Sequence, residues 1–232
     1  MIISHKYKFI FIKTRKTAGT SIEAFLSKQC GDEDVVTPVY PPIDGHKPRN
    51  YRGLFNPVAD LGYYSAGRWP KVAGDLLQRQ RFSRHIPALL VRSRVSAEIW
   101  NTYTKFCVDR DPIDKTLSHY YMLRMRGDGT MTIDDYFRRG RYCLNYRHYT
   151  DSQNRIIVDH VLRYENLDAE LTRIFGLLGV PFSGQLLERA KSDATETRVD
   201  YRTVLTGQQI EVIEQVFAEE VAILTRQEQA GV

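Results

Sequence analysis

Long hydrophobic runs are missing from this 232-residue sequence. Lys8 and Lys13 interrupt the longest apolar stretch near the N-terminus, which falls far short of the ~18 residues needed to cross a bilayer. The sequence also lacks the apolar segment and small-residue cleavage site of a secretory signal. Cysteine is scarce, and its positions form no Cys-x-x-Cys pair: Cys30, Cys107 and Cys143. This pattern argues against a disulfide framework or a cysteine zinc site, so we expect a protein of the reducing cytoplasm.

Charge of one sign is only slightly in excess. The 33 Lys and Arg residues outnumber the 28 Asp and Glu residues, and the isoelectric point is near 9.0, so the surface should favour anionic partners on average. The basic residues are scattered among acidic ones, and no helix-turn-helix, zinc-finger or aromatic RNA-binding signature occurs. We therefore expect no nucleic-acid partner. A binder driven by charge alone would instead show steeply salt-dependent affinity for any duplex.

The composition, with 42% hydrophobic and 26% charged residues, is that of a globular protein, and the length fits one domain over residues 1–232. Short apolar runs predict strands at 7–13, 102–108 and 156–164. Apolar spacing and capping residues predict helices at about 21–30, 86–100, 112–126, 132–137, 166–178 and 208–224. This alternation favours a three-layer α/β fold with a central, mostly parallel sheet flanked by helices.

Residues 31–74 differ from the rest of the chain. They hold six of the nine prolines and six of the fifteen glycines, together with several tyrosines and Trp69. Such a stretch is not expected to contain long regular structure, and a loop of this size in a compact domain is often functional.

The first candidate site is the segment Lys13-Thr-Arg-Lys-Thr-Ala-Gly-Thr-Ser21, between a predicted strand and a predicted helix. A loop in this place presents backbone N–H groups and a positive helix end to an anion, and Gly19 allows close approach. The segment is not a Walker A motif, because its lysine precedes the glycine. The alternative is a basic, well-capped turn with no ligand.

The second candidate site begins at Arg110, directly after a predicted strand, and continues to Ser118 in the following helix. Pro112 suits the first turn of that helix, which places Ser118 about two turns along it. Arg110 and Ser118 would share an anion that lies along the helix. The alternative is that Arg110 pairs with Asp109 or Asp111 and that Ser118 is merely exposed.

Together the two segments resemble the sulfotransferases that use 3′-phosphoadenosine 5′-phosphosulfate. Residues 15–21 are similar to the family's P-K-T-A-G-T-S loop, and residues 110–120 to its R-x-P-x-x-x-x-x-S-x-Y element. Tyr164-Glu-Asn-Leu167 is similar to a Y-E-D-L stretch, and the three segments occur in the family's order. Arg15 stands where proline is commoner and Asn166 where aspartate is commoner. The resemblance implies a P-loop-kinase-like sulfotransferase architecture.

The resemblance also implies roles for individual residues. Lys16 would neutralise charge on the departing phosphate, and no metal is required. The 5′-phosphosulfate would be held by Lys16, Thr17, Ala18, Gly19, Thr20 and Ser21. The 3′-phosphate would be held by Arg110 and Ser118, with Tyr164 near the adenine and Arg202 in a basic loop over the cofactor. The product would be adenosine 3′,5′-bisphosphate.

The general base is expected to be His85, because Ser83-Arg-His-Ile-Pro-Ala88 resembles the H-x-x-A element of the glycan-modifying branch. His46 and Glu23 are the alternatives, and a purely structural histidine is another. His119 is expected to flank the 3′-phosphate element.

The insertion at about 31–84 would bind the acceptor, and we expect a carbohydrate or glycoconjugate hydroxyl. A phenol, lipid or secondary-metabolite hydroxyl stays open. The functional alternatives are a non-catalytic nucleotide- or glycan-binding protein and an atypical nucleotide kinase.

Overall fold

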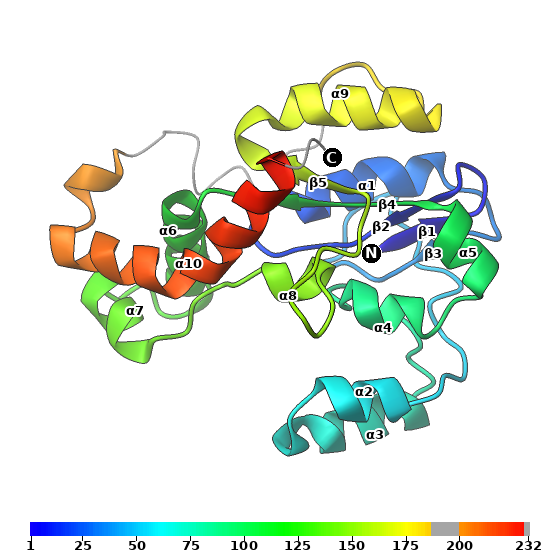
Figure 1. The fold of residues 1–232 in the computed structure, drawn as a ribbon, viewed down its shortest axis with the longest axis horizontal. Coiled ribbons are helices and arrows are strands. Elements are labelled where there is room, and N and C mark those ends of the chain that lie inside the picture. Colours follow the sequence, from blue (N-terminus) through cyan, green and yellow to red (C-terminus); the bar gives the residue numbers. More distant parts are fainter. Residues whose placement is uncertain (187–199, 230–232) are drawn as a thin grey trace.

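The computed structural model describes residues 1–186 and 200–229, which build a five-stranded sheet surrounded by helices (Figure 1). The sheet has the order β3-β1-β2-β4-β5. Strand β2 is parallel to β4, and β4 to β5, while β1 is antiparallel to both β2 and β3, so four strands share one direction. The strands are β1 (Ile2–Ser4), β2 (Phe9–Phe11), β3 (Val35–Val36), β4 (Thr104–Asp109) and β5 (His160–Arg163). The predicted α/β fold with a mostly parallel sheet is confirmed.

The two faces of the sheet are covered by different helices, because successive strand residues point to opposite sides. On one face, Phe9, Phe11 and Phe106 pack in a cluster with α1 (Gly19–Gln29) and α9 (Leu167–Leu178). On the other face, Ile10 and Cys107 pack in a cluster with three short helices and the end of the last one. These are α4 (Ala88–Arg92), α5 (Ala97–Thr102), α8 (Tyr146–Tyr149) and α10 (Gly207–Gln229).

A third group of helices lies beyond the carboxyl end of β4, at the left of Figure 1. It consists of α6 (Pro112–Arg126), α7 (Ile133–Arg139) and α10, which share a core that includes Leu117 and Phe217. Asp111 caps α6 with Pro112 in the first turn, and Thr132 with Asp135 forms a capping box at α7. These predicted helix starts are confirmed.

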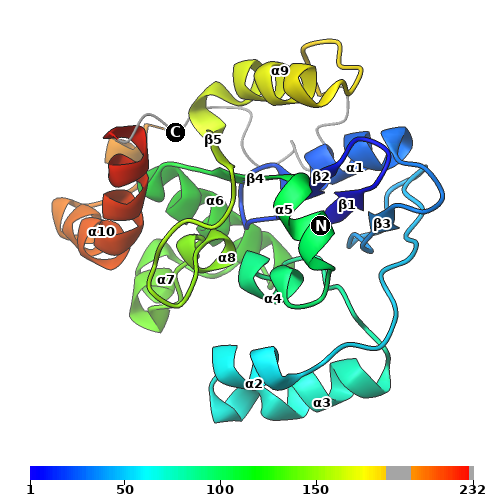
Figure 2. The ribbon, with the colours of Figure 1, turned by 45° about the vertical axis from the view of Figure 1, so that its right-hand side comes forward.

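Residues 31–84 contain more regular structure than the sequence predicts. A pair of helices, α2 (Val58–Tyr63) and α3 (Trp69–Leu77), is joined by the 3₁₀ turn η1 (Ala66–Arg68) and lies apart from the sheet (Figures 1 and 2). We call residues 58–77 the hairpin. A buried ion pair between Asp60 and Arg94 holds one part of the hairpin to the body. A second part of the hairpin is held by the hydroxyl of Tyr63, which donates to the carbonyl of Arg147, 2.8 Å away.

Several predicted boundaries are wrong. Helix α1 begins at Gly19 and not after a Ser21 cap, because Ala18 takes a left-handed conformation (φ 55°) that starts the helix early. The helix predicted at 86–100 is two helices, α4 and α5, since Ser96 accepts a hydrogen bond from the Ile99 amide and caps a new start. Strand β5 begins at residue 160 rather than 156, and Tyr164 lies in the 3₁₀ turn η2 (Tyr164–Asn166).

Across the described ranges, no helix is both long enough and apolar enough to span a bilayer.

Candidate functional site

The loop between β2 and α1, residues 14–18, is fixed from two sides. The Thr14 hydroxyl donates to the carbonyl of Val108 at the end of β4, and it lies 2.8 Å from the hydroxyl of Thr17. The Asn145 side chain brackets the peptide of Arg15: its Oδ1 accepts from the Arg15 amide and its Nδ2 donates to the Arg15 carbonyl, each over 3.0 Å. The loop is therefore held in one conformation by β4 and by the residue that precedes α8.

The backbone of this loop has a shape that suits an anion. Lys16 (φ 62°) and Ala18 (φ 55°) both adopt left-handed conformations, of the kind that turn successive N–H groups to one side. The first N–H groups of α1 have no acceptor within the helix. A Cβ on Gly19 would lie 2.8 Å from Cγ of Lys13, and this lysine is itself buried and paired with Glu23. Packing against Lys13 thus favours glycine at this position.

A Gly19→Ala substitution should lower the free energy of unfolding by about 1–3 kcal/mol, because the methyl group meets a side chain that cannot move away. Urea denaturation monitored by circular dichroism would measure the change. Gly74→Ala is the matched control, since nothing lies within 4 Å of its Cβ position in α3, and alanine there should stabilise by up to about 1 kcal/mol. Equal unfolding midpoints for Gly19→Ala and the parent protein would contradict this packing argument.

Arg110 joins three segments that are distant in the sequence. Its Nη1 donates to the carbonyl of Lys16 over 3.4 Å, and its guanidinium carbon lies 4.1 Å from the centre of the Tyr164 ring. The nearest carboxylate, that of Asp114, is 3.9 Å away and half exposed. The Nε of Arg110 is buried and has no hydrogen-bond partner among the described residues. A cation with one unpaired, buried donor is the feature expected where an anion binds.

The alternative pairing of Arg110 is wrong, because neither flanking aspartate binds its guanidinium. Asp109 accepts from the Arg110 backbone amide, and Asp111 caps α6 through the amides of Ile113 and Asp114. Ser118 is half-buried on α6, one turn beyond Asp114, and hence on the face of the helix that the guanidinium of Arg110 approaches through Asp114.

The remaining predicted cofactor residues are placed as follows. Thr17 is buried, and its hydroxyl contacts the hydroxyl of Thr14. A ligand would therefore meet the backbone of Thr17 and not its side chain. Ser21 lies buried within the first turn of α1, and Thr20 is half-buried beside it. The side chain of Arg202, in the 3₁₀ turn η4 (Tyr201–Thr203), lies outside the described part of the chain, as do residues 187–199.

A buried ionic network lies behind the loop and was not predicted from the sequence. Nζ of Lys115 contacts Oδ1 of Asp109 (2.8 Å) and also binds Glu220 of α10. The other oxygen of Glu220 accepts from the Asn145 amide (2.5 Å), and Oδ2 of Asp109 accepts from the Tyr149 hydroxyl (2.7 Å). Burial would lower the pKa of Lys115, but the two carboxylates outweigh it and raise that pKa. Lys115 therefore stays protonated in a fully buried site, where its charge is balanced by the carboxylates of Asp109 and Glu220.

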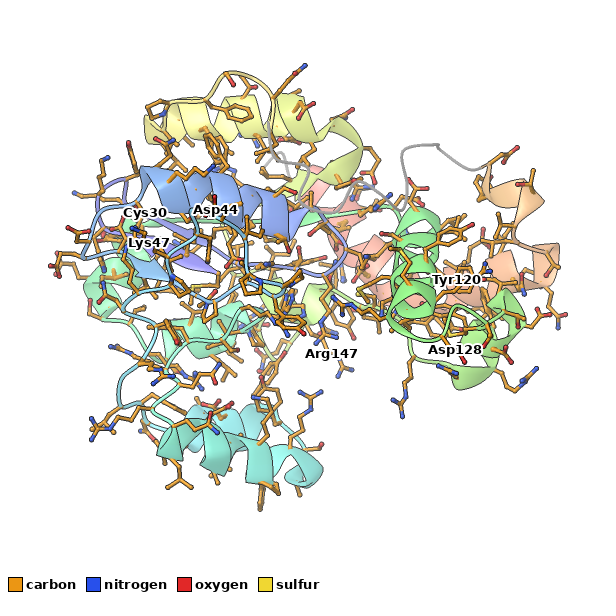
Figure 3. The ribbon with its side chains drawn as sticks, turned by 180° about the vertical axis from the view of Figure 1, so that it is seen from behind. Cys30, Asp44, Lys47, Tyr120, Asp128 and Arg147 are labelled. Atoms are coloured by element: carbon orange, nitrogen blue, oxygen red, sulfur yellow. The ribbon has the colours of Figure 1, made fainter. Side chains whose placement is uncertain are left out.

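An open cleft of about 1610 Å³ lies between the hairpin and the body of the protein, and its lining includes Arg15 and His85. Figure 3 shows Arg147, another lining residue, in the region that faces the hairpin. The aromatic residues of the 31–74 segment lie in different environments. Tyr40, Tyr63 and Tyr64 line the cleft, while Tyr51 packs against the core and Trp69 is exposed.

His85 has the orientation that a general base needs. Its Nδ1 lies 3.0 Å from the carbonyl of Lys13, and only a protonated nitrogen can donate to that oxygen, which leaves Nε2 as an acceptor. Removal from water lowers the pKa of His85 to about 2, so the ring is neutral at physiological pH. His85 thus joins the first candidate loop to the cleft.

His148 is a second histidine of the cleft and was missed by sequence reasoning. It is 8% exposed, its ring centre lies 6.3 Å from that of His85, and its Nδ1 has no hydrogen-bond partner in the described structure. Burial lowers its pKa to about 4. A lone histidine in a helix of four residues has no sequence pattern that singles it out.

The alternative bases lie away from the cleft lining. Glu23 is fully buried, is paired with Lys13, and accepts from the Thr37 hydroxyl (2.9 Å). His46 is buried, with Nε2 2.9 Å from the Thr37 carbonyl. His119, which is predicted to flank the 3′-phosphate element and is not one of the candidate bases, contacts the hydroxyl of Tyr136 over 3.1 Å. Of the three candidate bases, His85 is the one that lines the cleft.

Within residues 1–186 and 200–229, no group of three or more His, Cys, Asp or Glu side chains could hold a metal ion.

The fold and these contacts define an α/β protein with a candidate anion-binding loop beside an open cleft. Comparison with known proteins does not narrow this class further. No family model matches the chain. The chain is similar to an uncharacterized protein from Archaeoglobus fulgidus, with 29% identity over 101 residues, which is 41% of this chain and 84% of that protein.

Proposed function

We propose that the protein is a sulfotransferase that moves a sulfuryl group from 3′-phosphoadenosine 5′-phosphosulfate to a hydroxyl of a carbohydrate or glycoconjugate, and that its α/β fold has the P-loop-kinase-like sulfotransferase architecture. The observation that carries the proposal is Arg110, which contacts Lys16 of the first motif and Tyr164 of the third. Its buried Nε has no hydrogen-bond partner among the described residues. Three sequence motifs that suggest one cofactor therefore meet at one cation.

The residues present fit this cofactor. Lys16 and the N–H groups of residues 17–21 would hold the 5′-phosphosulfate, since the left-handed residues and the start of α1 provide donors there. Arg110 and Ser118 would hold the 3′-phosphate, with Tyr164 against the adenine. When bound, the cofactor supplies a sulfuryl group attached to a phosphate leaving group. Lys16 would offset the charge that builds on that phosphate.

His85 would take the proton from the acceptor hydroxyl. Its pKa of about 2 in the free protein makes it a weak base, so this role requires the bound anionic cofactor to raise that pKa. Its Nε2 is the free acceptor of a ring fixed by the Lys13 carbonyl, and Lys13 directly precedes the candidate loop. The acceptor would enter through the cleft that His85 lines, so the base and the phosphosulfate loop would meet at its end near Arg15. Positioning, charge stabilisation and one base are the elements that such an in-line transfer requires.

Calorimetric titration with adenosine 3′,5′-bisphosphate, beside adenosine triphosphate, tests the proposal. The bisphosphate should bind more tightly than the triphosphate, and Lys16→Ala and Arg110→Ala should each weaken it by about ten- to hundred-fold, as expected for lost charged hydrogen bonds. Lys47→Ala and Arg139→Ala, at exposed positions away from the loop and outside the cleft lining, are the matched controls and should bind normally.

Each other outcome has a distinct meaning. Preferred binding of the triphosphate would identify an atypical nucleotide kinase. Tight bisphosphate binding with no turnover on any hydroxyl acceptor would identify a non-catalytic nucleotide-binding protein. No bisphosphate binding would overturn the sulfotransferase proposal.

A further inference from the structure

The cleft lining is strongly biased toward positive charge, in contrast to the nearly balanced sequence. Five exposed arginines line it: Arg15, Arg68, Arg84, Arg92 and Arg147. In the part of the chain that the structure describes, none of the five forms an ion pair with a carboxylate. An unpaired group of guanidinium ions around one hollow favours an anionic occupant.

The acidic residues of the lining do not neutralise these arginines. Two aspartates line the cleft, and each is held by a basic neighbour on its own segment. Asp75 lies 2.5 Å from Nζ of Lys71, and Asp151 lies 2.7 Å from the guanidinium of Arg155. The five guanidinium groups therefore remain available to a ligand.

Tyrosines accompany the arginines on both walls. Arg68 of the hairpin lies over the ring of Tyr64, with 5.6 Å between the guanidinium carbon and the ring centre. On the opposite wall, Arg147 lies 5.7 Å from the Tyr146 ring and donates to its hydroxyl over 3.3 Å. Tyr146 is buried in the core, but Tyr63 and Tyr64 of the hairpin are only half-buried and line the cleft, so their rings offer amphipathic faces on which sugar rings pack. The nearby guanidinium groups suit carboxylate or sulfate.

We infer that the acceptor is an acidic saccharide chain that carries carboxylate or sulfate groups beside its free hydroxyls. This inference rests on the proposed function, which requires a hydroxyl next to His85, and it adds the charge and size of the molecule that brings it. The cleft volume of about 1610 Å³ exceeds the 300–1,000 Å³ typical of sites for single small molecules, so the cleft has room for several sugar units.

The test is direct binding of one oligosaccharide in two charge states. Hexagalacturonate and its full methyl ester have the same length and the same ring hydroxyls, but only the acid carries carboxylates. Calorimetry at low salt should give at least ten-fold tighter binding of the acid, and the difference should shrink as salt is raised. The double variant Arg68→Gln/Arg147→Gln should lose at least ten-fold affinity for the acid, with binding of the ester unchanged.

Arg139→Gln on α7 is the matched control, because this arginine is exposed but does not line the cleft. Equal affinity for acid and ester would overturn the inference, and so would an equal loss in the control. Tighter binding of a single-stranded oligonucleotide, dependent on the same two arginines, would overturn it in favour of a nucleic-acid ligand. The proposed function fails separately, through absent bisphosphate binding, which neither cleft substitution should alter.

Discussion

Replacing Lys115 by methionine should lower the free energy of unfolding by about 3–5 kcal/mol, because the change leaves Asp109 and Glu220 buried without their cation. Methionine keeps most of the side-chain volume, so the loss of charge dominates over any cavity. Urea denaturation followed by circular dichroism and by tyrosine fluorescence would measure the effect.

Lys71→Met is the matched control for this experiment. Lys71 pairs with Asp75 on the exposed surface of α3, where removing an ion pair costs about 0–0.5 kcal/mol. If the free energy of unfolding of Lys115→Met lies within 1 kcal/mol of the parent value, the buried network does not hold a charged lysine and does not link α6 to α10 through charge. A variant that cannot be purified folded, alongside a normal Lys71→Met, agrees with the expected loss.

His85→Asn should lower kcat about 10²- to 10⁴-fold on a competent acceptor while leaving the Kd of adenosine 3′,5′-bisphosphate unchanged. The asparagine amide still reaches the Lys13 carbonyl, so the variant keeps the positioning bond and loses only the acceptor nitrogen. His5→Asn is the matched control, because His5 lies before β2, at the end of that strand opposite to the candidate loop, and contacts Tyr103. A large loss in His148→Asn with normal turnover in His85→Asn would move the base to α8.

The pH dependence provides a second readout for His85. Because its pKa lies near 2 in the free protein, the ring stays neutral throughout pH 5–8. Protonation of His85 should therefore cause no fall in kcat/KM on the acid side of this range, since that quantity reports the free enzyme. An acid limb near pH 6.5 that disappears in His85→Asn would show that the ring is solvated as in a free histidine.

Local signals in the sequence predicted where several helices begin and end. Thr132 with Asp135 marks the start of α7, Pro112 the start of α6, and Gly179, left-handed in the structure, the end of α9. These predictions succeed because caps depend on neighbours within a few residues. Strands β1 and β3 were missed because neither lies in an apolar run as long as the one that contains β2. They are stabilised by pairing, β1 with β2 and β3 with β1.

The candidate site was predicted only where its residues are contiguous. The loop around Lys16 was found from its sequence. The cleft arginines are spread between residues 15 and 147 and come together only through the packing of the hairpin, α4 and α8. Glu220 was likewise hidden, because it occurs in a helix that otherwise shows ordinary amphipathic spacing. Long-range contacts of this kind have no signature in a single sequence.

Asn145 carries a consequence for the order of folding. It is separated from Arg15 by 130 residues and from Glu220 by 75, yet it binds both. Contacts so distant in sequence form late, since the entropy of closing long loops must be overcome before they contribute. Because Glu220 belongs to α10, a chain that lacks α10 should leave the loop around Lys16 without this support.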